Sequence, residues 1–426
     1  MQIIGIDIGT TSICGVAIDA DSGKILQSKT VNSEAFIESE FSWEKIQSPR
    51  KILRIAKEIL DSLITDETVS IGVTGQMHGI VYTDKMGAAV SPLYTWQDQR
   101  GNLPYEGATY AAFLGSHAGY GNVTDFYNRK NGLRPESAVS HCTIHDYFVM
   151  HLCGLKRPII HASNAASLGL YNLLDNQFDY EVNADLLNDY CIAGQYREIP
   201  VGVAIGDNQA SVFSTIADEG DVLINVGTGS QVSVISSEIT QGADIEVRPY
   251  FEGKYLIVGA ALCGGRAFSM LKDFYAEILR EVVDIRDAEI YKIMDKMLAK
   301  PCKVALEVDT RFAGTRRDTT LCGSINGITT ENFSPIALTH GVLAGMVEEL
   351  YKMYLQMGCK IKGIVGSGNG VRKNPSFIQL SEEKFGGKMK IPAHLEEAAF
   401  GAALFGAISA HIFKDAKEAQ RLICYQ

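Results

Sequence analysis

The sequence contains no hydrophobic run long enough to span a bilayer, so we do not expect a membrane protein. Its first residues, MQIIGIDIGTTS, lack the basic segment, apolar core and cleavage site of a secretory signal, and they are typical of a first strand. The nine cysteines form no CxxC pair and show no zinc-ligand spacing. Reduced thiols in a cytoplasmic protein are therefore expected.

An excess of positive charge is also missing. Lysine and arginine number 39 against 50 aspartates and glutamates, which gives a net charge of −11 and argues against a nucleic-acid partner. A small anionic ligand stays possible, because backbone N–H groups bind phosphate without a net positive charge. The P-loop pattern G-x-x-x-x-G-K-[ST] does not occur, so a P-loop nucleotide site is excluded.

A length of 426 residues exceeds one ordinary core and favours two domains. Strand-like and helix-like segments alternate, which indicates an α/β fold. The segment SPRKILRIAKEILDSLI predicts a helix with Ser48 as its cap and Pro49 in its first turn. The segment ICGVAIDADSGKILQSKTV predicts two strands around an Asp-Ser-Gly turn.

Two segments recur in the same order. IDIGTTSICGV (6–16) aligns without gaps to INVGTGSQVSV (224–234), and GVTGQMHG (72–79) aligns to GIVGSGNG (363–370). We infer a duplicated α/β unit with domains at 1–215 and 216–426. Two such domains are expected to face a cleft, and the glycine-rich turns at the strand ends should line it.

The turn after the first strand has the composition of a phosphate and cation site. Gly9 lets backbone N–H groups approach an anion, Thr10 and Thr11 add hydroxyl donors, and Asp7 can hold a hydrated Mg²⁺. A polar hairpin turn is the alternative. A second copy of the turn, Gly227-Thr228-Gly229, could grip the same nucleotide phosphates.

The turn Gly366-Ser367-Gly368 ends a strand in the second half and is followed by Asn374. Its spacing differs from the dinucleotide pattern G-x-G-x-x-G. A tight turn against a nucleoside, with Asn374 beside the base, fits better. An ordinary strand-to-helix turn explains the same residues equally well.

Asp207 stands between an apolar strand and an apolar helix, in VGVAIGDNQASV. A carboxylate there is costly to bury without a partner, but over a cleft it could act as a general base toward a hydroxyl. The alternative is an aspartate that caps the helix, and the two roles are compatible.

Two further segments suit a polyhydroxylated ligand. Trp96 could pack on the C–H face of a sugar while Asp98 and Arg100 bind hydroxyls, although an exposed turn with an ion pair is the alternative. In the turn GQMHG, Gln76 and His78 are candidate hydroxyl partners, with Met77 packing beneath them. A core histidine or a metal ligand are the other interpretations of this turn.

Taken together, these motifs resemble the FGGY family of carbohydrate kinases over nearly the whole chain. The motifs appear in the family's order: D-x-G-T-[TS]-S at 7–12, G-Q-M-H-G at 75–79, W-x-D-x-R at 96–100, G-D-N-Q at 206–209, G-T-G-S at 227–230, G-T-R at 314–316, G-S-G at 366–368 and E-A-A-x-G-A-A at 397–403. The resemblance implies two ribonuclease-H-like domains of the actin-like ATPase fold, facing a cleft. It implies ATP and Mg²⁺ as cofactors and a small sugar as partner.

The resemblance also implies roles for individual residues. Asp207 would be the catalytic base and Asp7 the partner of Mg²⁺. The residues implied at the sugar site are Gln76, His78, Trp96, Asp98 and Asn208. Those implied at the ATP site are Thr10, Thr11, Gly227, Thr228, Gly366, Gly368 and Asn374.

Within the family, segments such as TWQDQR and SNAASLGLYN resemble the kinases that phosphorylate D-sedoheptulose to its 7-phosphate. A pentulose or polyol kinase such as a xylulokinase is the alternative within the family. A non-catalytic, actin-like ATP-binding regulator is the alternative from another class. The chain is short for the family between residues 101 and 145, so sugar contacts from that segment are not predicted. The oligomeric state is left open, a homodimer included.

Overall fold

The computed structural model describes residues 1–285, 289–315, 318 and 320–426. Its contacts divide the chain into two compact units. The first unit comprises Met1–Ala217, Arg248–Lys254 and His394–Cys424, and the second comprises Asp218–Val247, Tyr255–Ala393 and Tyr425–Gln426. A single boundary near residue 215 would place His394–Cys424 in the second half, whereas this segment packs with the first unit.

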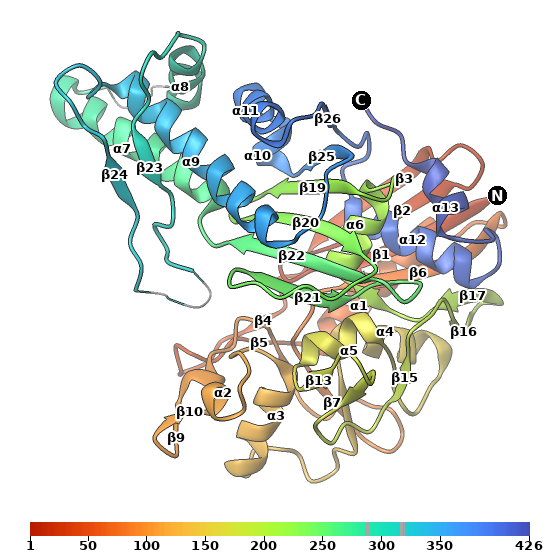
Figure 1. The fold of residues 1–426 in the computed structure, drawn as a ribbon. Helices are drawn as coiled ribbons and strands as arrows, with labels where there is room; N and C mark the ends of the chain where they lie inside the picture. Colours follow the sequence, from red (N-terminus) through yellow and green to blue (C-terminus); the bar gives the residue numbers. More distant parts are fainter. Residues whose placement is uncertain (286–288, 316–317, 319) are drawn as a thin grey trace. The chain divides into compact units, whose positions relative to one another are not determined.

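The sheet of the first unit has the strand order β16-β17-β6-β1-β2-β3 (Figure 1). Its centre is β1 (Gln2–Ile8), which pairs antiparallel with β2 (Ser12–Asp19) and parallel with β6 (Thr68–Gly75). The outer strands are β3 (Ile25–Asn32), β16 (Ile192–Tyr196) and β17 (Ile199–Gly202). The strands β2 and β3 lie on either side of the predicted Asp-Ser-Gly turn, which confirms that hairpin.

Helix α1 (Pro49–Leu63) confirms the prediction for this segment. The Ser48 side chain accepts a hydrogen bond from the backbone N–H of Lys51, and Pro49 occupies the first turn. The helix buries its apolar face against β1, β2 and β3. Together with α4 (Ile144–Cys153) and the sheet it forms one hydrophobic core.

Helix α12 (Glu397–Ser409) packs on β1 and β6 through glycines. A Cβ atom at Gly5 would lie 1.8 Å from the carbonyl oxygen of Ala399, and one at Gly72 would lie 1.7 Å from that of Ala402. Any side chain at these strand positions would therefore push the helix away. Helix α6 (Asp207–Thr215) packs against α12 in the same manner, through Gly401.

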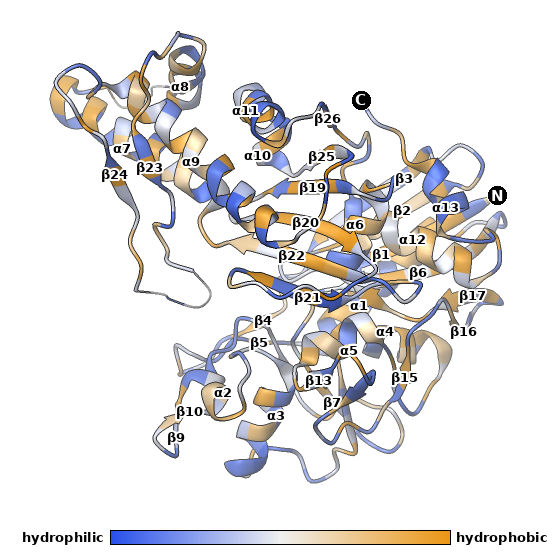
Figure 2. Ribbon diagram, in the orientation of Figure 1, coloured by the Kyte–Doolittle hydropathy of each residue, from blue (hydrophilic) through white to orange (hydrophobic). Residues whose placement is uncertain are grey.

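The second unit is built on a sheet with the order β21-β22-β20-β19-β25-β26 (Figure 1). Its strands are β19 (Asp221–Val226), β20 (Ser230–Ser236), β21 (Ile245–Pro249), β22 (Tyr255–Ala261), β25 (Gly363–Ser367) and β26 (Met389–Lys390). The helices α7 (Gly264–Val283), α8 (Ile290–Leu298), α9 (Pro335–Gln356) and α11 (Pro375–Phe385) complete its core. Figure 2 shows that β20 and β22 are predominantly hydrophobic.

The two sheets repeat one topology. In the first unit β1 pairs antiparallel with β2 and parallel with β6, and in the second β19 pairs antiparallel with β20 and parallel with β25. The aligned segments 6–16 and 224–234 form the corresponding hairpins. The predicted duplication of an α/β unit is therefore confirmed, and the predicted cleft between the units stays a prediction.

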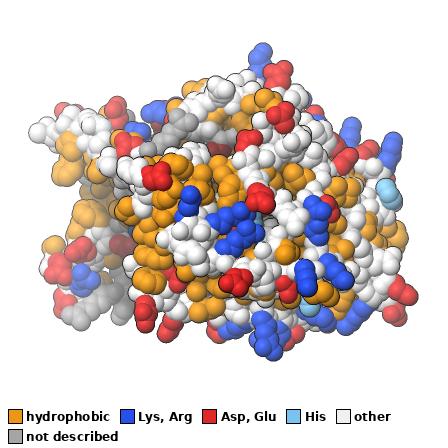
Figure 3. All heavy atoms as spheres, turned by 90° about the horizontal axis from the view of Figure 1, so that it is seen from below, with side chains coloured by type: hydrophobic (Ala, Val, Ile, Leu, Met, Phe, Trp, Pro, Cys, Tyr) orange, Lys and Arg blue, Asp and Glu red, His pale blue; other side chains and the backbone are white. Residues whose placement is uncertain are grey.

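The surface shown in Figure 3 is mixed in character. Lysine and arginine side chains form small groups between hydrophobic and acidic ones on this face. Within the part of the chain that the structure describes, every helix is too short or too polar to cross a membrane.

Candidate active site

Three strand ends of the first unit are aligned at one edge of the sheet. Ile8, the last residue of β1, is in register with Gly75, the last residue of β6. Gly75 is in turn in register with Gly206 of the short strand β18 (Ile205–Gly206). The turn with Thr10, the GQMHG turn and Asp207 therefore emerge at the same edge, as the positions of these motifs predict.

Asp207 is the first residue of α6, and Gly206 before it provides no side-chain cap. Burial of the Asp207 carboxyl raises its pKa to about 6, against the lowering effects of a hydrogen bond from the backbone N–H of Asn208 and the charge of Arg248. A carboxylate with such a pKa is still largely ionised at neutral pH and can accept a proton. The alternative that Asp207 caps the helix is wrong in position, because Gly206 occupies the cap and Asp207 is already in the first turn.

Asp7 lies near the end of β1, and its Oδ1 atom is buried without a hydrogen-bond partner among the described residues. Burial, together with the smaller effects of the Asp207 and Glu396 charges, raises the pKa of Asp7 to about 7. A buried carboxylate oxygen that lacks a donor fits a cation or its hydration water. The donor chemistry therefore suits Mg²⁺.

Over the described ranges, no group of three or more His, Cys, Asp or Glu side chains has the arrangement of a metal site. A Mg²⁺ ion at Asp7 would accordingly take most of its ligands from water and nucleotide oxygens, which is usual for this ion.

A hydrogen-bonded chain links the turn after β1 to the GQMHG turn. Trp96 Nε1 donates to Thr10 Oγ1 at 2.9 Å, and Thr10 Oγ1 donates to Gln76 Oε1 at 3.3 Å. Gln76 Nε2 donates to Gln47 Oε1 at 3.0 Å, and Gln47 Nε2 returns to the backbone oxygen of Thr10 at 2.7 Å. Thr10, which was predicted to bind ATP, therefore lies among residues that were predicted to bind the sugar. The ring of Trp96 is exposed.

Sequence reasoning missed Gln47. It is fully buried and comes from β5 (Ile46–Gln47), outside every recognised motif. Only its position two residues before the start of α1 distinguishes it, and that position carries no chemical signal.

His78 adopts a left-handed backbone conformation, with φ of 73°. Its backbone N–H donates to Ser167 Oγ at 3.2 Å, and its Nδ1 lies 2.8 Å from the Ser167 carbonyl oxygen. A carbonyl can only accept, so the proton of a neutral His78 resides on Nδ1 and its Nε2 is an acceptor. Strained backbone of this kind is typical of functional turns.

Tyr120 stacks on the His78 ring, with centroids 4.4 Å apart and an interplanar angle of 12°. This residue precedes α3 (Gly121–Lys130) and lies in the segment from which no sugar contact was predicted. Met77 is buried, and a Cβ atom at Gly206 would lie 2.9 Å from its sulfur. Met77 thus packs beneath the turn, consistent with its expected place.

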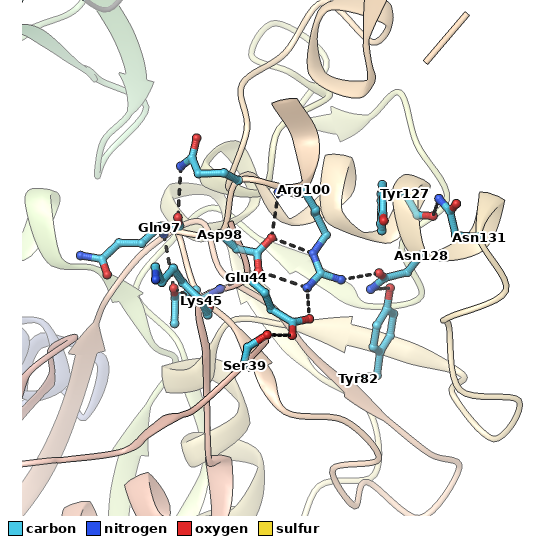
Figure 4. A network of polar contacts seen from close by, with 12 residues as sticks. Ser39, Glu44, Lys45, Tyr82, Gln97, Asp98, Arg100, Tyr127, Asn128 and Asn131 are labelled. Atoms are coloured by element: carbon cyan, nitrogen blue, oxygen red, sulfur yellow. Dashed lines mark hydrogen bonds and ion pairs between the residues drawn. The ribbon is translucent and has the colours of Figure 1, made fainter. Parts of the chain in front are cut away.

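Asp98 is engaged within the protein, as Figure 4 shows. Oδ1 accepts hydrogen bonds from the backbone N–H and from Nε of Arg100, and Oδ2 accepts from Arg100 Nη2 and from the Lys45 backbone N–H. A carboxylate offers about four lone-pair sites, and all are used here. The side chain is also fully buried, so direct contact with a sugar hydroxyl does not fit this arrangement.

Arg100 is 1% exposed, which corrects the alternative of an exposed ion pair in this turn. Its guanidinium also donates to Asn128 Oδ1 at 2.6 Å and to Glu44 Oε1 at 2.9 Å, and lies 4.2 Å from the centre of the Tyr94 ring. The W-x-D-x-R motif therefore builds a buried ionic network behind the turn and leaves Trp96 on its surface.

In the second unit, the turn Gly227–Gly229 connects β19 to β20. The backbone N–H groups of Gly265 and Arg266, at the start of α7, donate to the carbonyls of Gly227 and Thr228 at 3.1 and 2.9 Å. The start of the helix thus holds the turn in place.

The turn after β25 lies beside this one, because β19 and β25 are paired. Ser367 is buried and its hydroxyl accepts from Asn225 Nδ2 at 2.6 Å, while Gly368 has φ of 81°. A Cβ atom at Gly368 would lie 2.5 Å from the Val226 carbonyl oxygen. Asn374 caps α11, because its side-chain oxygen accepts a hydrogen bond from the Phe377 backbone N–H at 3.0 Å. This contact supports the alternative of an ordinary strand-to-helix turn.

Comparison with known proteins agrees with this architecture. Residues 2–105 match the N-terminal domain of the FGGY family of carbohydrate kinases. The chain is 29% identical to sedoheptulokinase of Homo sapiens over 94% of its own length and 96% of that protein. It is 22% identical to xylulose kinase of Staphylococcus epidermidis over 97% and 88% of the two chains.

The crystal structure of xylulose kinase from Rhodospirillum rubrum superposes with a TM-score of 0.85 at 17% identity, covering 100% of this chain and 93% of that one. That likeness establishes the actin-like α/β fold. The fold and the sequence match define the class of protein as a sugar-phosphorylating enzyme. The chain is similar to the FGGY family of carbohydrate kinases, both in the match of residues 2–105 and in its likeness to sedoheptulokinase.

Proposed function

We propose that the protein transfers the γ-phosphoryl group of ATP to a ketose, with D-sedoheptulose as substrate and sedoheptulose 7-phosphate as product. The observation that carries the proposal is the alignment of Asp207 with the turns after β1 and β6, where Thr10, Gln76 and Trp96 form one network. Similarity to the human sedoheptulokinase along nearly the whole chain supports the heptulose over a pentulose.

Asp207 acts in this proposal as the general base. It accepts the proton of the sugar hydroxyl while that oxygen forms a bond to the γ-phosphorus and the bond from phosphorus to the ADP oxygen breaks. A bound Mg²⁺ would neutralise charge on the phosphate oxygens, with Asp7 as its protein partner. The proton leaves Asp207 for solvent after the product departs.

In this proposal the sugar binds the first unit, and the nucleotide binds mainly the second. Gln76, His78, Trp96 and Asn208 would contact sugar hydroxyls, and Met77 and Asp98 would shape the turns that carry them. Tyr120 would extend the wall through its stack on His78. Aromatic rings next to fixed polar groups are well suited to sugar faces.

The phosphates of ATP would lie against Gly9, Thr10 and Thr11 and against the second copy of that turn. The residues proposed for the second copy and the nucleoside are Gly227, Thr228, Gly229, Gly366, Ser367, Gly368 and Asn374. Backbone N–H groups in such turns bind anions without basic side chains.

A coupled assay of ADP release over a panel of heptuloses, pentuloses and polyols tests the proposal. The proposal expects the highest kcat/KM with D-sedoheptulose. A higher value with D-xylulose would favour the pentulose kinase alternative, and activity on none of the sugars would overturn the proposal. The similarity to sedoheptulokinase along nearly the whole chain favours a kinase over a non-catalytic regulator. Cytoplasmic location and a homodimeric state stay predictions.

A further inference from the structure

The segment Arg248–Lys254 comprises the last two residues of β21 and the turn before β22, and it belongs to the first unit. Two contacts hold it there independently of its charges. The fully buried Gln209 donates through Nε2 to the carbonyl oxygen of Pro249 at 3.0 Å. The ring of Phe251, 2% exposed, packs in an aromatic cluster. Its neighbours lie at centroid distances of 5.1 Å for Phe213, 5.0 Å for Phe405 and 5.8 Å for Tyr190.

This docking brings Arg248 to the start of α6. Its Nη1 donates a hydrogen bond to Asn208 Oδ1 at 3.3 Å, and Asn208 directly follows Asp207. A guanidinium has donors only, so the atom of the Asn208 amide that faces it must be the oxygen. The amide nitrogen and its two N–H groups are therefore directed away from Arg248.

We infer that Arg248 is a positioning residue for phosphoryl transfer: it orients the Asn208 amide so that N–H donors are offered to an accepting oxygen of the sugar. The inference rests on the proposed function, in which Asn208 contacts the sugar beside the base. It goes further by assigning the direction of that hydrogen bond and by adding a residue forty positions away in sequence. No motif of the chain marked Arg248.

Electrostatics support the same assignment. The charge of Arg248 acts to lower the pKa of Asp207, opposing the larger effect of burial. A single guanidinium thus sets the orientation of one residue and favours the ionised form of its neighbour. Because Pro249 and Phe251 anchor the segment separately, removal of the guanidinium should leave the segment in place.

The test is a double-mutant cycle on the full-length protein with Arg248→Met, Asn208→Ala and the combined variant. Each single variant is expected to raise the KM for D-sedoheptulose about tenfold, because a hydrogen bond to the sugar is lost or misdirected, with the KM for ATP changed less than twofold. The double variant should be no worse than Asn208→Ala, since Arg248 acts through Asn208.

Lys254→Met is the matched control, because it removes a positive charge from the same segment. It should leave both KM values within twofold of the wild type. Asn208→Asp preserves an acceptor for Arg248 but removes the amide donors, and it should reproduce the effect of Asn208→Ala. Thermal unfolding of every variant checks the fold, and Arg248→Lys replaces Arg248→Met if the latter does not fold.

A wild-type KM in the Arg248 variant, or effects of the two substitutions that multiply, would overturn the inference. Near-wild-type activity of Asn208→Asp would overturn the direction of the hydrogen bond. A wild-type protein that phosphorylates none of the sugars would instead refute the proposed function, so the two failures are distinguishable.

Discussion

The hydroxyl of Thr10 lies 3.3 Å from Oε1 of Gln76 and donates to it, which joins the turn after β1 to the turn after β6. The turn proposed for phosphate and the turn proposed for the sugar are thereby parts of one hydrogen-bonded network. In the proposed reaction, the substrate hydroxyl and the transferred phosphoryl group would meet near this junction. Substitutions in the network should therefore weaken the binding of the sugar more than they destabilise the fold.

Gln47 is the buried member of this network, and Gln47→Leu tests it. The substitution removes hydrogen bonds to Thr10 and Gln76 and should raise the KM for the sugar about tenfold. Stability should fall by about 1–2 kcal/mol in urea unfolding. The same substitution at Gln27, an exposed position on β3, is the control and should change neither quantity. Equal effects at both positions would contradict the role of Gln47.

Asp98→Asn should lower the stability of the protein. Arg100 is fully buried, and its pair with Asp98 has Nε to Oδ1 at 2.7 Å. Loss of the carboxylate leaves a buried cation with Glu44 as its remaining ion-pair partner, and about 3 kcal/mol of unfolding free energy should be lost.

The pair Asp309 and Arg311 provides the comparison for Asp98. It has similar geometry, but both side chains are substantially exposed, and Asp309→Asn should cost less than about 1 kcal/mol. Urea unfolding measures both variants. An unchanged stability of Asp98→Asn together with a raised sugar KM would show that Asp98 binds substrate directly.

Asp7→Asn should weaken the binding of Mg²⁺. The variant keeps the size of the side chain but removes the charge from the unpartnered, buried Oδ1. We expect the Mg²⁺ concentration for half-maximal activity to rise about tenfold or more at saturating ATP. Asp19→Asn, at the end of β2, should leave that concentration unchanged. An unaltered Mg²⁺ requirement in Asp7→Asn would mean that this residue has another role.

Stability should fall with acid through His141. Its Nε2 lies 2.9 Å from Asn122 Oδ1, and burial lowers its pKa to about 4. The unfolded chain binds a proton at this residue near pH 6.5, whereas the folded state does so only near pH 4. Stability is therefore present above pH 6.5 and decreases as the pH falls toward 4, by about 2 kcal/mol between pH 7 and pH 5.

His141→Gln isolates this contribution, because other buried groups also titrate. Urea unfolding at pH 7 and pH 5 should show a smaller decrease for the variant than for the wild type. A decrease of the same size in both proteins would show that His141 does not carry this pH dependence.

The sequence predicted what local patterns encode. The repeat predicted that β19, β20 and β25 would copy β1, β2 and β6, because equal spacing of strands and glycines produces equal pairing. Ser48 and Pro49 predicted the start of α1 because capping depends on neighbours in sequence.

Features set by tertiary packing were missed. Gln47, Tyr120 and Arg248 reach the site from segments without recognisable motifs. Asp98 was predicted to bind the sugar. The spacing of Asp98 and Arg100 in the sequence does not reveal that the two side chains are buried together. The return of α12 to the first unit is equally a long-range contact, which depends on Gly5 and Gly72 leaving room for a helix.

The central claim is that Asp207 is the base that activates a ketose hydroxyl. Its most direct test is the single-turnover rate of sedoheptulose phosphate formation in Asp207→Asn compared with the wild type, with ATP affinity measured on the same samples. We predict that the rate of the variant is lower by about a thousandfold or more, and that its ATP affinity is within twofold of the wild-type value. A variant that retains most of the rate, or that loses ATP binding instead, would contradict the claim.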